Sequence, residues 1–470
     1  MGDYRGLGGM SVKTTREQSG FTIVELLIVI VVIAVLAAIA VVAFNGIQAK
    51  AVETSLQSDL RNAATQLGSE NTTNGVFPAT ESAANGGSGL KKSSYTRYQY
   101  SYIAGTNAYC LTATATKPGI PAYMVSSDNQ AVRKGICPGH IDYASSGSAD
   151  VQVSTLIGDG IGGAIDGTGS GARIQNPYGI VVDSSGTLYT TETASARIRR
   201  VTPTGTATTI AGGSAGYVEG NGTAARFSSP TGIARAANGN LYVSDRGNHR
   251  IRRIDTSYNV TTFAGTGVAG YTEGAAASAQ FNLNVANDVV FDSQGNLYAS
   301  DLNNARIRKI TTAGVVSSLT SCSDIWSVCN PTGLSVDSQD NIYVANRAYN
   351  RIDKVTPSGT VSRLAGGGAD GMTSGYQDGS GDQALFNDLS DIAVDGSGNV
   401  YVADYANHRI RKVTSSGQVS TIAGTGVQGF SDGAAHTARF NAPYGIAVDP
   451  SGTIVYVADW GNQRIRKITL

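Results

Sequence analysis

The strongest hydrophobic pattern lies near the start of the chain. Residues 26–44 form an uninterrupted apolar run of 19 residues, close to the roughly 20 that a helix needs to span a bilayer. Beyond this run, apolar residues recur at helical spacing and predict a helix over 21–70, which the stretch Asn71-Thr-Thr-Asn-Gly75 ends. Basic residues precede the run, which predicts that everything after it lies outside the cytoplasmic membrane.

The pattern changes to short alternating runs between residues 90 and 140. Four runs of strand type, 95–103, 109–116, 122–126 and 132–136, predict a small antiparallel sheet. A Ser/Gly/Ala-rich stretch at 143–149 follows and is typical of a linker. The first domain is therefore predicted over 21–142, as a long α-helix plus a small antiparallel sheet.

From residue 150 onward the chain repeats itself. Six segments follow one template of three short strands, with a fourth strand after most of them: 176–201, 230–254, 287–310, 331–355, 390–413 and 443–468. Four antiparallel strands per repeat of roughly 45–58 residues predict the blades of an all-β propeller.

The repeats also predict how the ring closes. The sixth copy stops after its third strand, and Val153-Ser-Thr-Leu resembles the fourth strand that begins at Val419. Strand 151–157 should therefore complete the last blade and remove two unpaired sheet edges. The prediction is a six-bladed propeller over 150–470.

The residues at the start of the apolar run resemble a known signal. Gly20-Phe-Thr-Ile-Val-Glu-Leu-Leu27 looks like the prepilin signal of type IV pilins and pseudopilins. The resemblance implies a leader of residues 1–20, cleavage by a prepilin peptidase between Gly20 and Phe21, and N-methylation of Phe21. It also implies that Glu25 meets the N-terminal amine of a neighbouring subunit during assembly.

This resemblance explains a carboxylate at the edge of a membrane helix. A lone charge in lipid costs several kcal/mol, so Glu25 needs a cationic partner. A secretory signal peptide has a shorter apolar core, of about 7–15 residues. A plain transmembrane anchor explains the length of the run but not the glutamate.

The repeats carry a second resemblance. The phrase Asn-His-Arg-Ile-Arg occurs at 248–252 and again at 407–411, and it resembles the NHL repeat family, which the other copies match more loosely. The fold class that follows is a pilin-like α+β domain ahead of a six-bladed NHL-type β-propeller.

Composition narrows the functions and suggests disulfides. The 35 basic and 35 acidic residues balance, which argues against a general electrostatic nucleic-acid binder. Four cysteines in an exported chain predict the disulfides Cys110–Cys137 and Cys322–Cys329. Four reduced core thiols are the alternative.

Long loops on one face of the propeller are the candidate ligand-binding surface. Their aromatic residues, with the tryptophan of the loop between the last two cysteines, are Tyr217, Tyr271, Trp326, Tyr376, Tyr405, Phe430 and Trp460. The alternative is that the repeated loop residues only cap turns and pack the blades. The residues of the Arg-Ile-Arg phrase would then alternate between the blade interior and the surface.

Catalysis finds little support in the sequence. Some related propellers are lyases, lactonases or esterases with a central metal. Here the propeller holds three histidines, and no HExxH or GxSxG motif occurs. We therefore predict no catalytic residue, no metal ligand and no cofactor, although a calcium ion in the central channel remains an alternative without a specific motif.

The sequence thus predicts a subunit of a type IV pilus or a similar filament. It would stay in the inner membrane before assembly and then reach the cell surface, displaying the propeller for adhesion or for protein or glycan binding. Its predicted partners are other pilin subunits, the prepilin peptidase and an extracellular ligand, with no nucleic acid. The alternatives are a secretion-system pseudopilin and a membrane-anchored propeller enzyme resembling a lyase or lactonase.

Overall fold

The computed structural model describes residues 23–78, 84, 88–94, 96–103, 108–115, 122–127, 129–134, 137, 151–283 and 287–470. The leader, the cleavage site at Gly20 and Phe21, and the linker at 143–149 lie outside the described residues, so the predicted domain boundaries stay predictions. The chain divides into two units, Met1–Thr54 and Ser55–Leu470.

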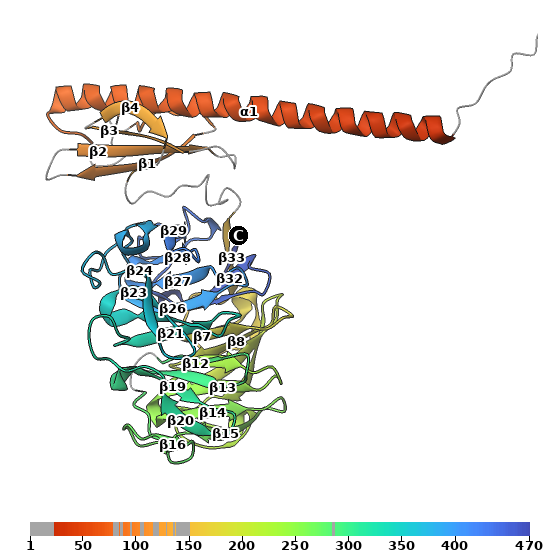
Figure 1. Ribbon diagram of the computed structural model, residues 1–470, viewed down its shortest axis with the longest axis vertical. Helices are drawn as coiled ribbons and strands as arrows, with labels where there is room; N and C mark the ends of the chain where they lie inside the picture. Colours follow the sequence, from red (N-terminus) through yellow and green to blue (C-terminus); the bar gives the residue numbers. More distant parts are fainter. Residues whose placement is uncertain are drawn as a thin grey trace, which may run out of the picture. The chain divides into compact units, whose positions relative to one another are not determined.

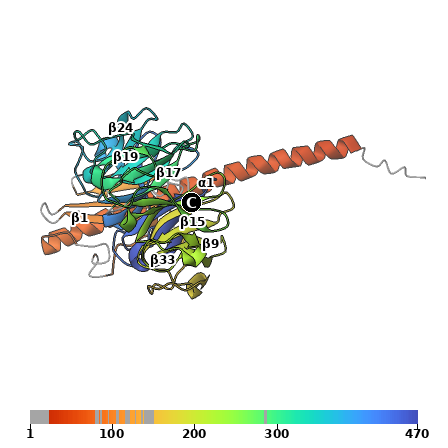
Figure 2. The same ribbon diagram turned by 90° about the horizontal axis from the view of Figure 1, so that it is seen from below.

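The first element is one continuous helix, α1 (Ile23–Asn74), as Figures 1 and 2 show. It ends because Gly75 adopts a left-handed conformation (φ 74°) and donates its N–H to the carbonyl oxygen of Asn71 at 2.8 Å. Within α1, side chains are described from residue 48 onward. In that part of the chain no helix is long and apolar enough to cross a membrane. The apolar run 26–44 and the Glu25 side chain lie outside it.

A four-stranded antiparallel sheet follows in the order β1-β2-β3-β4. Its strands are β1 (Thr96–Ile103), β2 (Ala108–Ala115), β3 (Tyr123–Ser126) and β4 (Asn129–Lys134). The Asp59 carboxylate of α1 accepts hydrogen bonds from the Ser93 N–H at 3.0 Å and the Ser93 hydroxyl at 2.8 Å, and from the Thr96 hydroxyl of β1. The disulfide Cys110–Cys137 is present, as predicted.

The repeats form a β-propeller of six sheets (Figure 1, yellow through blue), and this part of the predicted fold is confirmed. The inner strands of the blades are β7 (Pro177–Val182), β12 (Pro230–Arg235), β17 (Val289–Phe291), β21 (Pro331–Val336), β26 (Leu389–Val394) and β31 (Pro443–Val448). The second strands are β8 (Leu188–Glu192), β13 (Leu241–Asp245), β18 (Leu297–Asp301), β22 (Ile342–Asn346), β27 (Val400–Asp404) and β32 (Ile454–Asp459).

The outer half of each blade follows the same order. The third strands are β9 (Arg197–Val201), β14 (Arg250–Ile254), β19 (Arg306–Ile310), β23 (Arg351–Val355), β28 (Arg409–Val413) and β33 (Arg464–Thr469). The fourth strands are β10 (Thr206–Gly212), β15 (Asn259–Ala264), β20 (Val315–Ser318), β24 (Val361–Gly366), β29 (Gln418–Ala423) and β5 (Gln152–Ile157). All blades except the fourth add a two-residue outer strand: β6 (Gly167–Thr168), β11 (Gly220–Asn221), β16 (Gly274–Ala275), β25 (Gly379–Ser380) and β30 (Gly433–Ala434).

The two ends of the repeat region meet in the sixth blade. Strand β5 pairs antiparallel with β33, with Val153 opposite Ile468. Each inner strand contacts the next one around the ring, and β31 contacts β7. Apolar side chains fill the space between neighbouring sheets, as where Ala345 and Ile352 of the fourth blade join Ile392 and Val400 of the fifth. Packing between blades thus holds the ring together.

A buried ion pair recurs in five blades. The last residue of the second strand bonds the second arginine of the Arg-Ile-Arg phrase, as in Asp245–Arg252 at 2.9 Å and Asp404–Arg411 at 2.7 Å, and both side chains are fully buried. The others are Glu192–Arg199, Asp301–Arg308 and Asp459–Arg466. Every one of these second arginines lies inside the blade, so the Asp and Arg of the repeat phrase are structural.

The fourth blade replaces this ion pair by an amide and a carboxylate. Asn346 stands where the other second strands end in an acid, and Asp353 replaces the buried arginine. The Asn346 amide donates to Asp353 at 2.7 Å, and the Arg351 guanidinium bonds the same carboxylate at 2.8 Å. The irregular loop closed by the predicted disulfide Cys322–Cys329 belongs to this blade.

Candidate binding site at the channel mouth

The centre of the propeller is a channel lined by the inner strands. The second residue of the repeated inner-strand phrase differs between blades and comprises Tyr178, Thr231, Asn287, Thr332, Ser390 and Tyr444. The third is glycine in four blades and aspartate in two, at Asp288 and Asp391. A side chain at Gly232 would overlap the Asp288 carboxylate, and one at Gly333 would overlap that of Asp391. Each aspartate thus fills space left by the glycine of a neighbouring blade.

A second set of equivalent residues, one from each blade, surrounds the mouth of this channel and is called the mouth ring. The residue directly after the second strand is Thr193, Arg246, Leu302, Arg347, Tyr405 or Trp460 in blades one to six. In five blades it begins a 3-10 turn, such as η4 (Arg246–Asn248), η8 (Tyr405–Asn407) or η9 (Trp460–Asn462). The residue after each turn is left-handed, as at His249 (φ 49°).

The turns are fixed to the blade scaffold. The Asn248 side chain donates to Asp245 at 2.8 Å and to the Gly216 carbonyl at 2.9 Å, and equivalent bonds hold Asn407 and Asn462. In blades two, three, five and six, the first residue of the turn is therefore held at the mouth by this repeated framework, while its own chemistry varies from blade to blade. Variable side chains on a rigid scaffold are typical of a recognition site.

Five residues of this ring, with Asn176, Tyr178 and Tyr444, line a cavity of about 340 Å³. Its aromatic floor is formed by Tyr178 and Tyr444, whose ring centroids lie 3.8 Å apart with an interplanar angle of 32°. Tyr405 meets Tyr444 edge-on, with the centroids 5.7 Å apart. Burial raises the pKa of both floor tyrosines well above the usual value, so their hydroxyls stay protonated at neutral pH.

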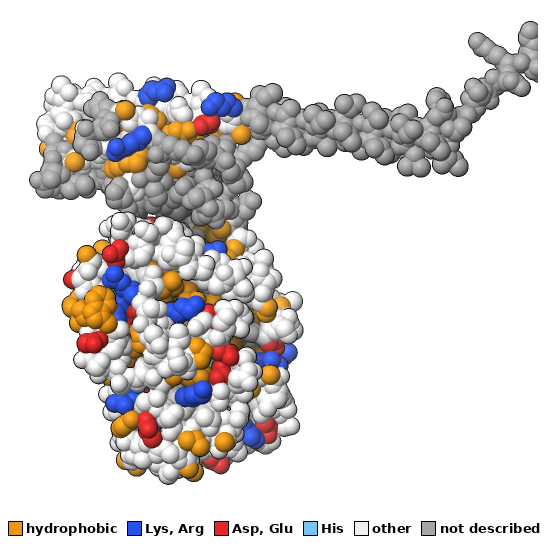
Figure 3. Space-filling model, viewed as in Figure 1, with side chains coloured by type: hydrophobic (Ala, Val, Ile, Leu, Met, Phe, Trp, Pro, Cys, Tyr) orange, Lys and Arg blue, Asp and Glu red, His pale blue; other side chains and the backbone are white. Residues whose placement is uncertain are grey.

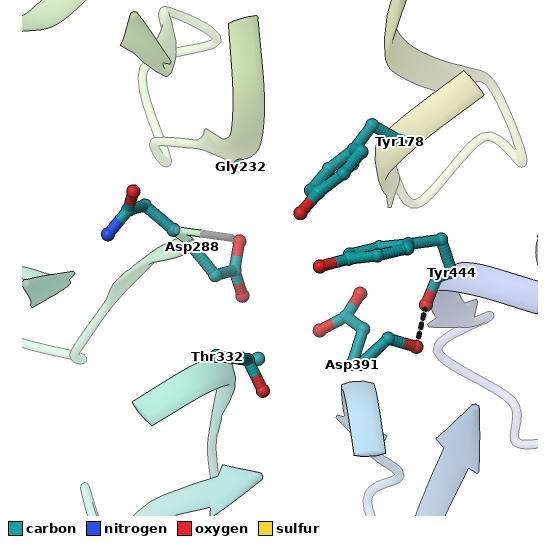
Figure 4. Close-up of a pocket in the computed structure, with 10 residues that line it drawn as sticks. Tyr178, Gly232, Asp288, Thr332, Asp391 and Tyr444 are labelled. Carbon is teal, nitrogen blue, oxygen red and sulfur yellow. Dashed lines mark hydrogen bonds between the residues drawn. The ribbon is translucent and has the colours of Figure 1, made fainter. Parts of the chain in front are cut away.

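Below the floor, the channel narrows to a cavity of about 10 Å³. Figure 4 shows the rings of Tyr178 and Tyr444 lying one over the other, with the Asp391 carboxylate next to Tyr444 and the Asp288 carboxylate on the opposite side of the channel. The Leu334 N–H donates to Asp288 at 3.0 Å, and the Ile446 N–H donates to Asp391 at 3.0 Å. On the other side of these aspartates the channel widens to about 250 Å³ between the inner strands.

Both channel aspartates hold their protons more tightly than an exposed aspartate. Burial raises the pKa of the Asp288 carboxyl to about 7, and burial together with the nearby Asp288 raises the pKa of Asp391 well above its usual range. The folded state therefore binds protons at a pH where the unfolded chain, with an aspartate pKa of about 3.9, has released them.

This proton binding predicts a pH-dependent stability. Because the folded state binds more protons, both groups contribute stability that declines as the pH rises above about 4, and the contribution of Asp288 is lost by about pH 7. The double variant Asp288→Asn/Asp391→Asn should flatten that decline and melt at a higher temperature than the native chain at pH 8. Thermal unfolding followed at several pH values measures this, and an unchanged decline in the variant would contradict the assignment.

The structure brings two of the predicted ligand-face residues together. Tyr405 and Trp460 both line the mouth cavity. The other loop aromatics stay within their own blades, each packed under the first arginine of a third strand. The guanidinium-to-ring distances are 4.0 Å for Arg250–Tyr217, 4.0 Å for Arg306–Tyr271, 3.6 Å for Arg409–Tyr376 and 3.7 Å for Arg464–Phe430. These four rings do not join one aromatic surface.

Trp326 lies apart from the mouth and is 57% exposed. Its ring lies 5.9 Å from the guanidinium groups of Arg351 and Arg363. The histidines of the repeat phrase are structural, since His249 and His408 accept backbone N–H bonds from Leu283 and Ala442.

Sequence reasoning missed Tyr178, Tyr444, Arg246 and the two channel aspartates. The signal was available in the differences between repeats: the third inner-strand position changes from glycine to aspartate twice, and the position after the second strand holds five different residue types in six blades. No group of three His, Cys, Asp or Glu side chains able to hold a metal ion occurs among the described residues.

Comparison with known proteins defines the class of the fold. The NHL repeat family model matches residues 227–254, and the model of the teneurin NHL domain matches 312–415. A structural genomics protein of unknown function from Bacteroides thetaiotaomicron superimposes with a TM-score of 0.54 and 21% identity, covering 77% of this chain and 84% of that chain. The repeats therefore form an NHL-type β-propeller.

The N-terminus matches a different family. The prokaryotic N-terminal methylation motif matches residues 15–41. The chain thus carries a pilin-type N-terminal motif ahead of its NHL propeller, as the sequence predicts.

Two curated relatives match part of this chain. The protein SUPPRESSOR OF QUENCHING 1 of Arabidopsis thaliana is 30% identical over 281 residues, which is 55% of this chain and 26% of that protein. Teneurin-3 of Danio rerio is 28% identical over 369 residues, which is 67% of this chain and 13% of that protein. The chain therefore spans a minor part of both relatives.

Proposed function

We propose that this chain is a subunit of a type IV pilus or a similar surface filament, and that it displays its propeller outside the cell. The observation that carries the proposal is the methylation motif at residues 15–41, joined to the continuous helix α1. After cleavage before Phe21, such a helix stays with the mature subunit and packs against other subunits. Glu25 supplies the carboxylate that pairs with a neighbour's N-terminal amine.

We further propose that the propeller is a binding module rather than an enzyme, and that the ligand enters the mouth cavity. Its support is the ring of six positions that carries five different residue types, with aromatic faces at Tyr405 and Trp460. Basic and acidic side chains are interspersed on the propeller surface in view in Figure 3. That distribution favours a specific cavity over binding to a broad charged surface.

The binding role predicts that ligand binding is lost when the aromatic wall of the cavity, formed by Tyr405 and Trp460, is removed. The full chain, purified in detergent, is applied to glycan and peptide arrays. On the ligands that bind the native chain, the amount of protein retained should fall at least about tenfold for the double variant Tyr405→Ala/Trp460→Ala, because aromatic contacts dominate such sites.

The exposed tryptophan elsewhere provides the control. Trp326→Ala removes a ring of the same kind outside the cavity and should leave retention unchanged. Retention that depends on Trp326 and not on Tyr405 and Trp460 would move the site to the disulfide loop. Retention that neither variant changes would contradict a ligand site at the mouth.

A further inference from the structure

The mouth ring has two unlike halves. Tyr405 and Trp460 occupy blades five and six, while Arg246 and Arg347 occupy blades two and four. In a ring of six, the second blade lies across from the fifth. Arg246 therefore faces the aromatic wall across the cavity that both line.

The two arginines differ in what they bind within the protein. The Arg347 guanidinium forms an ion pair with Asp388 through two of its nitrogens, one of them at 2.9 Å from a carboxylate oxygen. For the Arg246 guanidinium no ion pair or hydrogen bond occurs among the described residues, although the group is half-buried. The positive charges of Arg246 and Arg347 act on the floor of the cavity, where both lower the pKa of Tyr178 and so oppose the effect of burial.

The Arg246 guanidinium is partly removed from water and has no partner in the part of the protein that the structure describes, so an anion can bind it favourably. Its planar fork of N–H donors fits a carboxylate, which accepts two parallel hydrogen bonds. Removing such a group from water without a partner is unfavourable, so a ligand carboxylate would restore the lost interactions. The cationic half of the mouth thus selects for negative charge.

The aromatic half favours a ring with an apolar face. Trp460 and Tyr405 are half-buried, and the floor formed by the tilted ring pair Tyr178–Tyr444 closes the cavity below them. The cavity of about 340 Å³ lies at the lower end of the range of small-molecule sites. Its remaining lining residues, Asn176 and Thr193, carry polar groups that can bond hydroxyls.

We propose that the mouth binds an acidic sugar, with its carboxylate on Arg246 and its ring against Tyr405 and Trp460. This inference rests on the proposed binding role of the propeller and names the class of ligand. A sugar is favoured over a peptide C-terminus because the flat aromatic faces fit a sugar ring and the polar lining residues can bond its hydroxyls. The closed floor limits the length of the ligand, and Arg246, unpaired among the residues described, accounts for the negative charge.

The test uses the intrinsic fluorescence of Trp460. The chain has two tryptophans, so in the full-length Trp326→Phe background Trp460 is the sole reporter. Digalacturonate should change its emission saturably and bind at least about tenfold more tightly than the neutral galactobiose, the difference expected for a charge-assisted hydrogen-bond pair. The preference should weaken as salt is added.

Two variants separate the role of the charge from general effects. Arg246→Gln should lower the affinity for digalacturonate about tenfold and abolish the preference over galactobiose. Arg200→Gln, a half-buried arginine of β9 that does not line the cavity, should change neither. Equal binding of both disaccharides, unchanged in Arg246→Gln, would overturn the role of the charge.

The remaining outcomes distinguish this inference from the proposed function. Tighter binding of trialanine, which carries a free C-terminal carboxylate, than of digalacturonate would overturn the sugar and leave the binding role intact. Binding of none of these probes would overturn the acidic-sugar assignment. Retention on the arrays would then still decide whether the mouth binds a ligand, and sheared filaments would still report on assembly.

Discussion

Replacing Arg411 by alanine is expected to lower the free energy of unfolding of the propeller by about 3–5 kcal/mol, because it leaves a buried carboxylate without its partner. The Arg411 side chain is fully buried between Asp404, at 2.7 Å, and Asp378, at 2.6 Å. It also donates to the carbonyl oxygens of Leu385 and Gln377. The variant therefore removes two ion pairs, and with them the two hydrogen bonds to Leu385 and Gln377 that tie the outer loop to the blade.

The neighbouring residue supplies the matched control. Lys412 lies on the same strand, is half-buried and packs over Tyr401 at 5.5 Å, so Lys412→Ala should cost less than about 1 kcal/mol. Urea unfolding of the two full-length variants under identical conditions measures the difference. Equal midpoints would show that the buried pair does not stabilise the blade.

The second large effect concerns assembly. Glu25→Ala should reduce the amount of the subunit in sheared surface filaments by about 100-fold, while cleavage after Gly20 continues. A charge costs about 2.5–3.5 kcal/mol at the centre of a membrane helix unless a partner neutralises it, and this is the upper bound for Glu25 at the edge of the apolar run. If the neighbouring subunit's amine is that partner, loss of the carboxylate removes an attraction of similar size, which corresponds to that fold-change.

A second glutamate of the same helix tests whether the effect is local. Glu53 forms an ion pair with Lys50 at 3.1 Å, farther along α1 than the methylation motif. Glu53→Ala should assemble at the native level. If Glu25→Ala also assembles at the native level, the carboxylate has no role in pairing subunits. If Glu25→Ala is no longer cleaved, its effect would lie in processing.

The sequence predicted the blades because each repeat carries the same pattern of strands and turns. Because six copies align, a strand that is unclear in one copy can be recognised from the others. The match of residues 153–156 to the fourth strand of another blade correctly placed β5 beside β33. The two-residue outer strands were missed, since pairs such as Gly220–Asn221 have neither alternation nor β-branched residues. Their pairing depends on the loop that folds back along the fourth strand.

The site was harder to predict because it depends on how blades face each other. The motif Arg-Ile-Arg looked like alternation between interior and surface, yet Arg252 is fully buried on Asp245. Loop aromatics looked like a binding surface, yet Tyr271 packs under Arg306. Tyr178 and Tyr444 occupy strand positions and meet only when the first and sixth blades become neighbours. Spacing within one repeat does not reveal such a contact.

The central claim is that a processed, pilin-type subunit carries the propeller to the cell surface. Mass spectrometry of sheared surface filaments digested with trypsin tests it most directly, because no lysine or arginine occurs between residues 17 and 49. The account predicts a peptide of residues 21–50 with an N-methylated Phe21, together with propeller peptides in the same fraction. A chain that still bears residues 17–20 and is found only in membranes would contradict it.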